Sequence, residues 1–270
     1  MLAGFHKLDN DNFKNHRGIC NMRKKVLFIL IILFIAAALP AVLLFFRERL
    51  PLETDIAGLK EQDMPGLHQI EPPDGAQLLT FPIDNGAIIA GYHNAAYLEK
   101  MGYLHYGIDL MVADGGYAEV FSSGAGVVLG TEFCDNSPGH IAIIQYDDVF
   151  VPLTGEIISL IARYYHMVSL MVDTGDVLSP RQPIGSIDST HEHYHHIHIE
   201  LDANIEFPFH TPQVAEISST LLHRYPASGE KMPDPISVLA VGDGQRIFVH
   251  PRALYCAEKD NPQFSYAKQH

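Results

Sequence analysis

His105 and Asp109 offer an imidazole nitrogen and a carboxylate oxygen at a spacing of four residues. Both groups are good zinc ligands. Residues four apart lie on the same side of either a strand or a helix. Gly107 and Ile108, which stand between the two, disfavour a helix, so we expect extended chain. Taken alone, the pair is better explained by a structural hydrogen bond between the two side chains.

A second segment, HIHIEL at residues 196–201, alternates polar and apolar residues. On a strand this period of two sends His196, His198 and Glu200 to one face and three apolar side chains to the other. Two imidazoles on one face favour the wall of a site, and the alternative is a solvated polar face. His166, which follows two tyrosines, is a third candidate. By itself it is explained as an ordinary half-buried residue.

Taken together and in their order along the chain, the three segments resemble the lysostaphin/LytM-type zinc endopeptidases, which cleave peptidoglycan peptides. That family shows HxGxD, then a histidine after Tyr-x, then HxH on a strand. The glycine-containing segments 124–128, 172–177 and 184–185 also resemble the family. The resemblance covers roughly residues 79–205, and residues 234–239 match the closing segment. Residues 186–195 replace the family's glycine-rich loop before HxH, and residues 205–232 look like an insertion.

The resemblance implies one zinc ion per chain, held by His105, Asp109 and His198, with a fourth position open for water. It implies that His196 and His166 are catalytic, one as the general base for the water and the other as its orienting or oxyanion-stabilising partner. Which of the two takes the proton stays open. The implied reaction is the hydrolysis of peptide bonds in bacterial peptidoglycan by zinc-activated water.

A competing zinc motif, HExxH, is present at residues 191–195. That motif works on a helix, where the two histidines meet one metal ion beside the glutamate. Here it runs directly into the alternating pattern of the following strand, with Pro183 and Gly185 just upstream. We therefore interpret these residues as a polar loop at the rim of the site.

Short apolar runs separated by turn residues follow one another from about residue 78, at 87–90, 126–129, 140–145, 160–165 and 196–201. Such runs predict closely spaced β-strands. Residues 169–185 fit two strand ends around a turn at 173–176, residues 214–222 a short helix, and residues 246–250 a last strand. The fold class expected is mainly β, a compact antiparallel β-barrel or sandwich of the LytM type.

Residues 26–46 form an uncharged run of 21 residues, which is long enough to span a membrane as one helix. Residues 1–25 hold six basic and two acidic side chains, so the positive-inside rule places them in the cytoplasm. We expect an anchor in the bacterial inner membrane, a tether at 47–78, the zinc endopeptidase domain at 79–205 outside the cytoplasm, and an insertion with closing segment at 206–270. A signal peptide starting at Met22 and cleaved near 36–38 is the alternative.

The net charge of the 270 residues is −14, and residues 47–270 hold 12 basic and 30 acidic groups. This balance excludes binding of nucleic acid through a basic surface. Cys134 and Cys256 fall in the exported part, where they are expected to form a disulfide. Two other functions stay open: a non-catalytic module that binds cell wall or activates a hydrolase, and a processing protease for a protein substrate. The sequence leaves the oligomeric state open.

Overall fold

The computed structural model describes residues 71–134, 139–188, 196–212, 219–224, 231–250 and 253. The expected anchor at 26–46, the HExxH loop at 191–195 and Cys256 lie outside these residues, so the predictions made for them stay predictions. Among the helices that are described, none is both long and apolar enough to cross a membrane.

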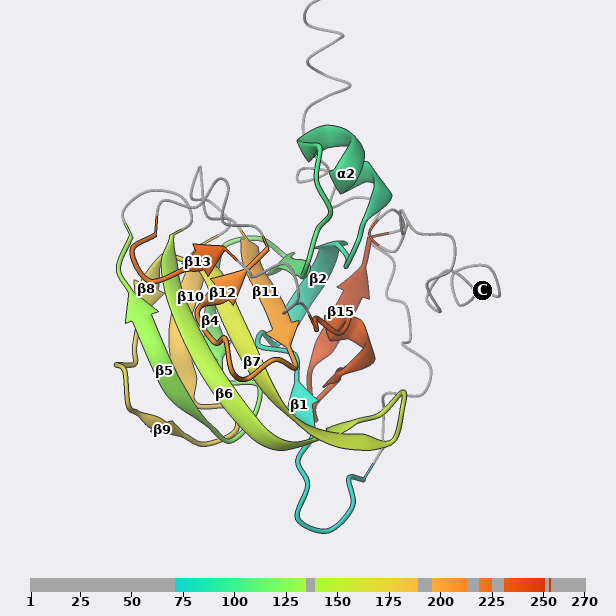
Figure 1. Ribbon diagram of the computed structural model, residues 1–270. Coiled ribbons are helices and arrows are strands. Elements are labelled where there is room, and N and C mark those ends of the chain that lie inside the picture. The colour runs from blue at the N-terminus through green and yellow to red at the C-terminus, as the bar shows by residue number, and fades with distance from the viewer. Residues whose placement is uncertain are drawn as a thin grey trace, which may run out of the picture. The chain divides into compact units, whose positions relative to one another are not determined.

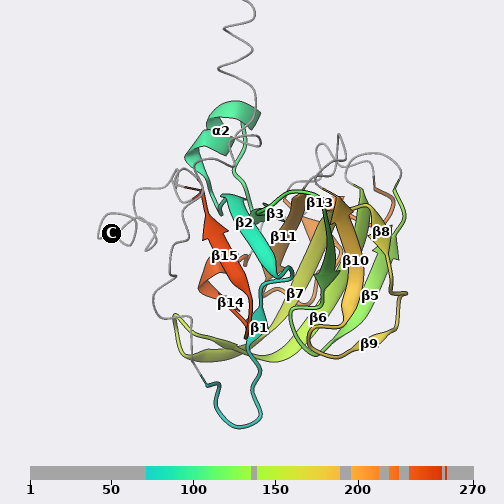
Figure 2. The same cartoon turned by 180° about the vertical axis from the view of Figure 1, so that it is seen from behind.

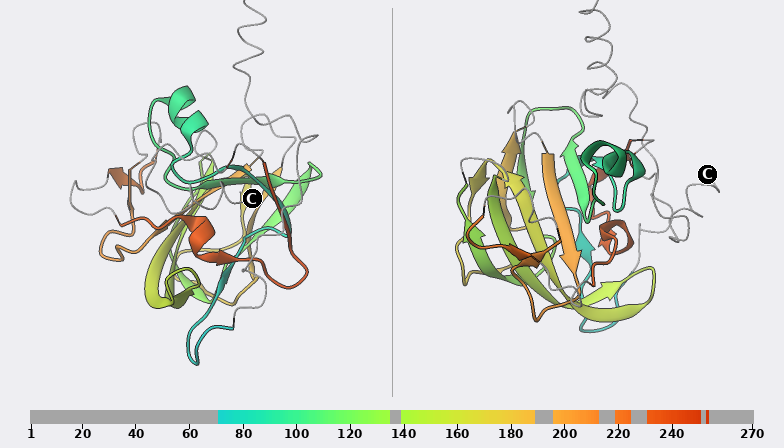
Figure 3. Two further views of the ribbon diagram at one scale, coloured as in Figure 1. Left: turned by 90° about the vertical axis from the view of Figure 1, so that its right-hand side faces the viewer. Right: turned by 45° about the horizontal axis from the view of Figure 1, so that its top comes forward.

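Most of the described chain is β-structure, and eight strands form one large sheet (Figure 1). Their order across the sheet is β15 (Arg246–Val249), β2 (Asn85–Ala90), β3 (Ile108–Val112), β11 (His196–Asp202), β7 (Glu156–Met167), β6 (His140–Val151), β5 (Gly126–Glu132) and β9 (Val177–Leu178). Neighbours are antiparallel except β15 and β2, which run parallel. The β6–β7 hairpin bends towards its tip (Figure 3), near a register shift between Tyr146 and Val149.

The inner face of this sheet packs against a smaller sheet of three strands (Figure 2), in the order β4 (Tyr117–Phe121), β10 (Pro183–Asp188) and β8 (Ser169–Leu170). Apolar side chains fill the core between the two sheets. They alternate with polar ones along β11, so that every second residue of this strand points inward. Ile197 and Ile199 of β11 share one buried cluster with Val120 of β4 and Ile187 of β10. Two further strands, β1 (Leu79–Thr80) and β14 (Leu239–Ala240), pair in parallel beside a short 3-10 helix, η4 (Pro235–Ser237).

The outer face of the large sheet is partly covered by residues 203–212 and 219–224, which we call the covering segment. It carries the short parallel strands β12 (His210–Thr211) and β13 (His223–Arg224), which lie in front of β6 and β7 in Figure 1. A second buried cluster joins this segment to the sheet through Phe209, Leu221, Leu222, Ile143, Ile161 and Tyr165. The described residues 205–212 and 219–224 of the expected insertion therefore pack on the domain.

The expectation of a mainly β fold is confirmed, whereas closure into a barrel is wrong for the described residues. Strands β15 and β9 stand at opposite edges of the large sheet and do not pair with each other. Of the helix expected at 214–222, only residues 219–222 are described, and they are not helical; for residues 214–218 the expectation stays a prediction. The one α-helix described, α2 (Ala95–Met101), was not expected from the sequence. It is short, capped by the Asn94 side chain at its start and by left-handed Gly102 at its end.

Candidate metal centre

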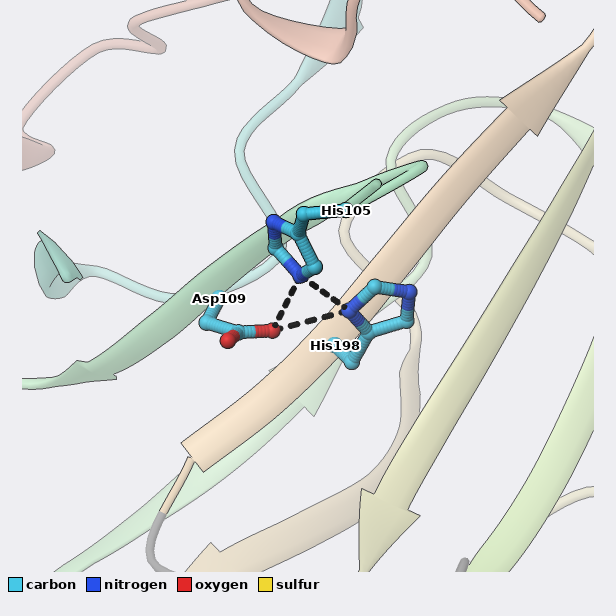
Figure 4. Close-up of side chains that lie close together, drawn as sticks. All are labelled: His105, Asp109 and His198. Atoms are coloured by element: carbon cyan, nitrogen blue, oxygen red, sulfur yellow. Dashed lines mark hydrogen bonds and ion pairs between the residues drawn. The ribbon is translucent and has the colours of Figure 1, made fainter. Parts of the chain in front are cut away.

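Three side chains predicted as metal ligands meet at one point on the outer face of the large sheet (Figure 4). His105 Nε2 lies 3.1 Å from Asp109 Oδ1 and 3.0 Å from His198 Nδ1, and His198 Nδ1 lies 2.8 Å from Asp109 Oδ1. Ligands of a tetrahedral zinc ion stand about 3.4 Å apart, since each lies about 2.1 Å from the metal. The three atoms therefore form a triangle only slightly smaller than one that zinc would hold.

The pairing of strands explains how residues so far apart in the chain meet. His198 of β11 stands directly opposite Asp109 of β3 in an antiparallel pair. Their side chains therefore leave the same face of the sheet side by side. His105 lies in a loop just before β3, and Asp109 lies on β3, so the pair is not helical, as expected. Its ring is stacked on Tyr97 of α2, with 4.3 Å between ring centroids.

Gly107 of the predicted motif has a steric reason to be glycine. A Cβ atom built there would lie 2.4 Å from the backbone oxygen of Ile199 and 2.7 Å from Cε1 of His198. The chain before β3 thus passes so close to the metal-ligand ring that no side chain fits between them. The sequence alone does not predict this close approach.

The hydrogen bonds around the two histidines decide which ring nitrogens face the centre as acceptors. His105 Nδ1 lies 2.8 Å from the carbonyl oxygen of Gly91, which can only accept, so this nitrogen carries the proton. His198 Nε2 faces the Glu200 carboxylate at 3.5 Å, which places the proton of a neutral His198 on that nitrogen. Both centre-facing nitrogens then present lone pairs beside a carboxylate oxygen. Such a set of three acceptors calls for a cation among them.

The electrostatics agree with that requirement. Burial raises the pKa of Asp109, but the neighbouring His105 and His196 hold this pKa well below its ordinary value. Burial by itself would lower the pKa of His198, because it disfavours the charged ring. The hydrogen bonds of His198 to Asp109 and Glu200 outweigh burial and raise its pKa to about 9. Without a metal ion the centre thus retains a proton, the other cation that can neutralise it.

His166 reaches this face only because strand β7 is irregular. Ile141 of β6 stands opposite two residues, Tyr165 and His166, in a β-bulge, and His166 has a positive φ of 66°. Successive strand residues normally point to opposite faces. Here Tyr164 and Met167 enter the inner core, while Tyr165 and His166 both lie beside His198, with ring centroids 5.4 and 6.2 Å away.

The two histidines predicted as catalytic lie together at the rim of the centre. The rings of His166 and His196 are 4.8 Å apart between centroids, and His196 Nε2 lies 3.8 Å from Asp109 Oδ1. Both residues are half-buried, whereas the three candidate ligands are buried. The structure therefore brings together all five predicted site residues. Three are buried side chains with possible metal-ligating atoms, and two are half-buried imidazoles.

Sequence reasoning missed the buried ionic network behind His198. Glu200 stands opposite Arg163 of β7 and lies 3.5 Å from its guanidinium, and both side chains are fully buried. Asp202 accepts a 2.8 Å hydrogen bond from the same guanidinium. The polar face of β11 is thus buried at His198, Glu200 and Asp202, and His196 at its start is half-buried. Charged residues on two apolar strands were the signal available, but the covering segment that buries them was not predictable.

The predicted disulfide stays a prediction, because Cys134 is described and Cys256 is not. In the described structure the backbone amide of Cys134 donates a hydrogen bond to His140 Nδ1.

Comparisons with known proteins give structural likenesses only. No protein-family model matches the sequence, and no curated protein matches it either. Among solved structures, a chain of the SpoIIQ–SpoIIIAH pore-forming complex is 17% identical, over 62% of this chain and 93% of that one, with a TM-score of 0.42. Lysostaphin is 18% identical over 60% of this chain and 54% of that one, with a TM-score of 0.39. A zinc-containing peptidase from Vibrio cholerae is 22% identical over 47% of this chain and 37% of that one, with a TM-score of 0.36. At these values the likenesses say nothing of what this chain does, but its solved neighbours include peptidases of the lysostaphin/LytM type, the family that its motifs resemble.

Proposed function

We propose that this chain is a zinc metallopeptidase that hydrolyses peptide bonds in bacterial peptidoglycan. The observation that carries the proposal is the convergence of three buried donors, His105 Nε2, Asp109 Oδ1 and His198 Nδ1, within 3.1 Å of one another. Two imidazoles and one carboxylate are a donor set typical of catalytic zinc. The choice of peptidoglycan as substrate rests on the resemblance of the motifs to the lysostaphin/LytM-type endopeptidases.

Zinc in such a site supplies a Lewis acid that makes water nucleophilic near neutral pH. The chain's own residues would hold and move the protons. His196 and His166 stand side by side at the wetter rim, so either can take a proton from the attacking water and pass it to solvent or to the leaving amine. The other imidazole can then donate a hydrogen bond to the oxyanion that develops on the peptide carbonyl.

Metal analysis and hydrolysis measured on the same variants test these roles. We expect His198→Ala and His105→Ala to lose both zinc and the release of amino groups from purified peptidoglycan. His196→Gln and His166→Gln should retain zinc and lose hydrolysis. Full zinc retention in His198→Ala would refute the ligand set.

The substrate itself needs a separate assay with the wild-type chain. Release of new amino groups from peptidoglycan that stops on adding a chelator is the expected result. Binding to peptidoglycan without release would instead indicate a non-catalytic module, and cleavage confined to proteins would indicate a processing protease. Mass spectrometry of the released fragments identifies the bond that is cut.

We also propose that residues 26–46 anchor the chain in the inner membrane with residues 1–25 in the cytoplasm. The support is the uncharged run of 21 residues and the excess of basic residues before it. Immunoblots of separated membrane and soluble fractions test this. A shortened, soluble product would indicate a cleaved signal peptide.

A further inference from the structure

Glu200, two residues beyond His198 on the same face of β11, has a buried carboxylate whose two oxygens both face polar groups. Oε1 accepts a 3.0 Å hydrogen bond from the Thr211 hydroxyl and faces His198 Nε2 at 3.5 Å. Oε2 accepts a 3.0 Å hydrogen bond from the Tyr165 hydroxyl and faces the Arg163 guanidinium at 3.5 Å. The carboxylate is thus fixed from four directions, one of which is the candidate metal ligand.

Part of this surrounding belongs to the covering segment rather than to the sheet. Thr211, on β12, is fully buried. The Arg163 guanidinium donates hydrogen bonds to the backbone oxygens of Pro208 at 3.0 Å and Phe207 at 3.3 Å. The segment that looked like an insertion in the sequence therefore completes the shell around Glu200.

Glu200 can orient the ring of His198 only if its own position is fixed. A carboxylate beside the outer nitrogen of a metal-bound histidine sets the tautomer and the ring orientation, and loss of such partners typically costs about 10–100-fold in metal affinity. Without Thr211, Oε1 would keep only its 3.5 Å approach to His198 in a place that water does not reach. The carboxylate could then turn towards the guanidinium and leave the ring.

We propose that Thr211 of the covering segment is a positioning residue for the metal centre, acting through Glu200 on the ring of His198. This inference rests on the proposed zinc site. It assigns the covering segment a role in metal binding: the segment holds the second layer of the site in place and keeps it dry.

The test compares zinc affinity of Thr211→Val with that of the wild-type full-length chain, measured by competition with a chelator. Valine keeps the shape of threonine and removes its hydroxyl, so we expect about a tenfold or greater rise in the dissociation constant. Thr211→Ser, which retains the hydroxyl, should bind zinc with the affinity of the wild type. Thr211→Ala is measured alongside, because it removes the hydroxyl without putting the second methyl group of valine beside the Glu200 carboxylate.

The matched control is Thr220→Val, in the same covering segment. The Thr220 hydroxyl donates to Glu132 at 2.8 Å, on the exposed side of the segment. Its loss should leave zinc affinity unchanged. The absorption spectrum of the cobalt-loaded protein is a second readout, which should change in Thr211→Val and stay as in the wild type in Thr220→Val.

Equal zinc affinity in Thr211→Val and wild type would overturn the inference while leaving the proposed function standing. An equal loss in Thr220→Val would also overturn it, since the effect would then come from packing of the segment as a whole. A wild-type chain that binds no zinc would overturn the proposed function, and this inference with it.

Discussion

Replacing Gly107 with alanine should deform the proposed metal centre without changing any of its ligands. The added Cβ would lie 2.4 Å from the Ile199 backbone oxygen, 2.7 Å from Cε1 of His198 and 2.8 Å from its Nε2. Gly107 has no positive φ, so the backbone conformation itself is one that alanine can adopt. The whole effect is therefore steric.

The displacement required can be worked from these contacts. Ordinary contact begins near 3.4 Å, so the His198 ring would have to retreat by about 0.7 Å and the backbone oxygen by about 1 Å. The backbone of β11 is held on both sides, by β3 and by β7, and cannot move freely. Metal–ligand distances tolerate deviations of about 0.2 Å. A shift of even half the required size thus takes the ring nitrogen out of position.

We expect Gly107→Ala to lower the free energy of unfolding by about 1–3 kcal/mol, the usual cost of an overpacked interior. Its zinc affinity should fall by at least tenfold, because the ligand ring is displaced. Chemical denaturation of the metal-free protein measures the first quantity, and chelator competition measures the second.

The control for this experiment is Gly155→Ala in the turn of the β6–β7 hairpin. Gly155 has a φ of 73° and no atom within 4 Å of an added Cβ, so alanine strains the backbone without a clash. This variant should lose stability and keep full zinc affinity. Unchanged zinc affinity in Gly107→Ala would refute the close approach of Gly107 to His198, and with it the steric reasoning.

Three further predictions concern the surroundings of the centre. Gly139→Ala places a Cβ 2.8 Å from Cα of His166 at a φ of 76°, so it should slow peptide hydrolysis while zinc, measured by metal analysis, is retained. The raised pKa of His198, about 9 against an ordinary 6.5, stabilises the metal-free fold below about pH 6.5, and this contribution is lost as the pH rises through 9. Zinc affinity should rise over the same range because zinc displaces that proton. Denaturation and chelator competition at a series of pH values measure the two, and a pH-independent affinity would contradict the displacement of a proton from His198. Arg163→Met leaves two buried carboxylates without their cation and should cost about 3–5 kcal/mol of unfolding free energy in urea.

The alternating pattern at residues 196–201 was sufficient to predict the strand and the face that its histidines share. Apolar residues on one side of a strand leave only one way to bury them, so the orientation follows from the sequence. The partner strand does not follow, because Asp109 and His198 are 89 residues apart and any of several strands could have stood between them. That the two lie 2.8 Å apart depends on the register of β3 against β11.

The burial of the strand face around Glu200 could not be predicted from the sequence, for a related physical reason. A strand face that carries Glu200 and two histidines predicts contact with solvent, unless another segment covers it. The cover comes from residues that show no periodicity, so nothing in the local pattern predicted their place. The buried arginine opposite Glu200 was the nearest available signal, since a charge on an otherwise apolar strand needs a partner.

The position of His166 beside the centre does not follow from the alternation of strand residues. By strict alternation the residue after Tyr165 returns to the inner core, where an imidazole would have had to replace apolar packing. The bulge in β7 and the left-handed backbone of His166 turn the ring outward instead, and Gly139 leaves room for this because any Cβ there would clash with His166. A left-handed backbone costs about 1–2 kcal/mol for a residue with a side chain. Strain of this kind persists where the surrounding structure imposes it, and it clusters at functional sites. Because the strain here places this imidazole 4.8 Å from that of His196, between centroids, it favours a catalytic role for His166 over that of an ordinary half-buried residue.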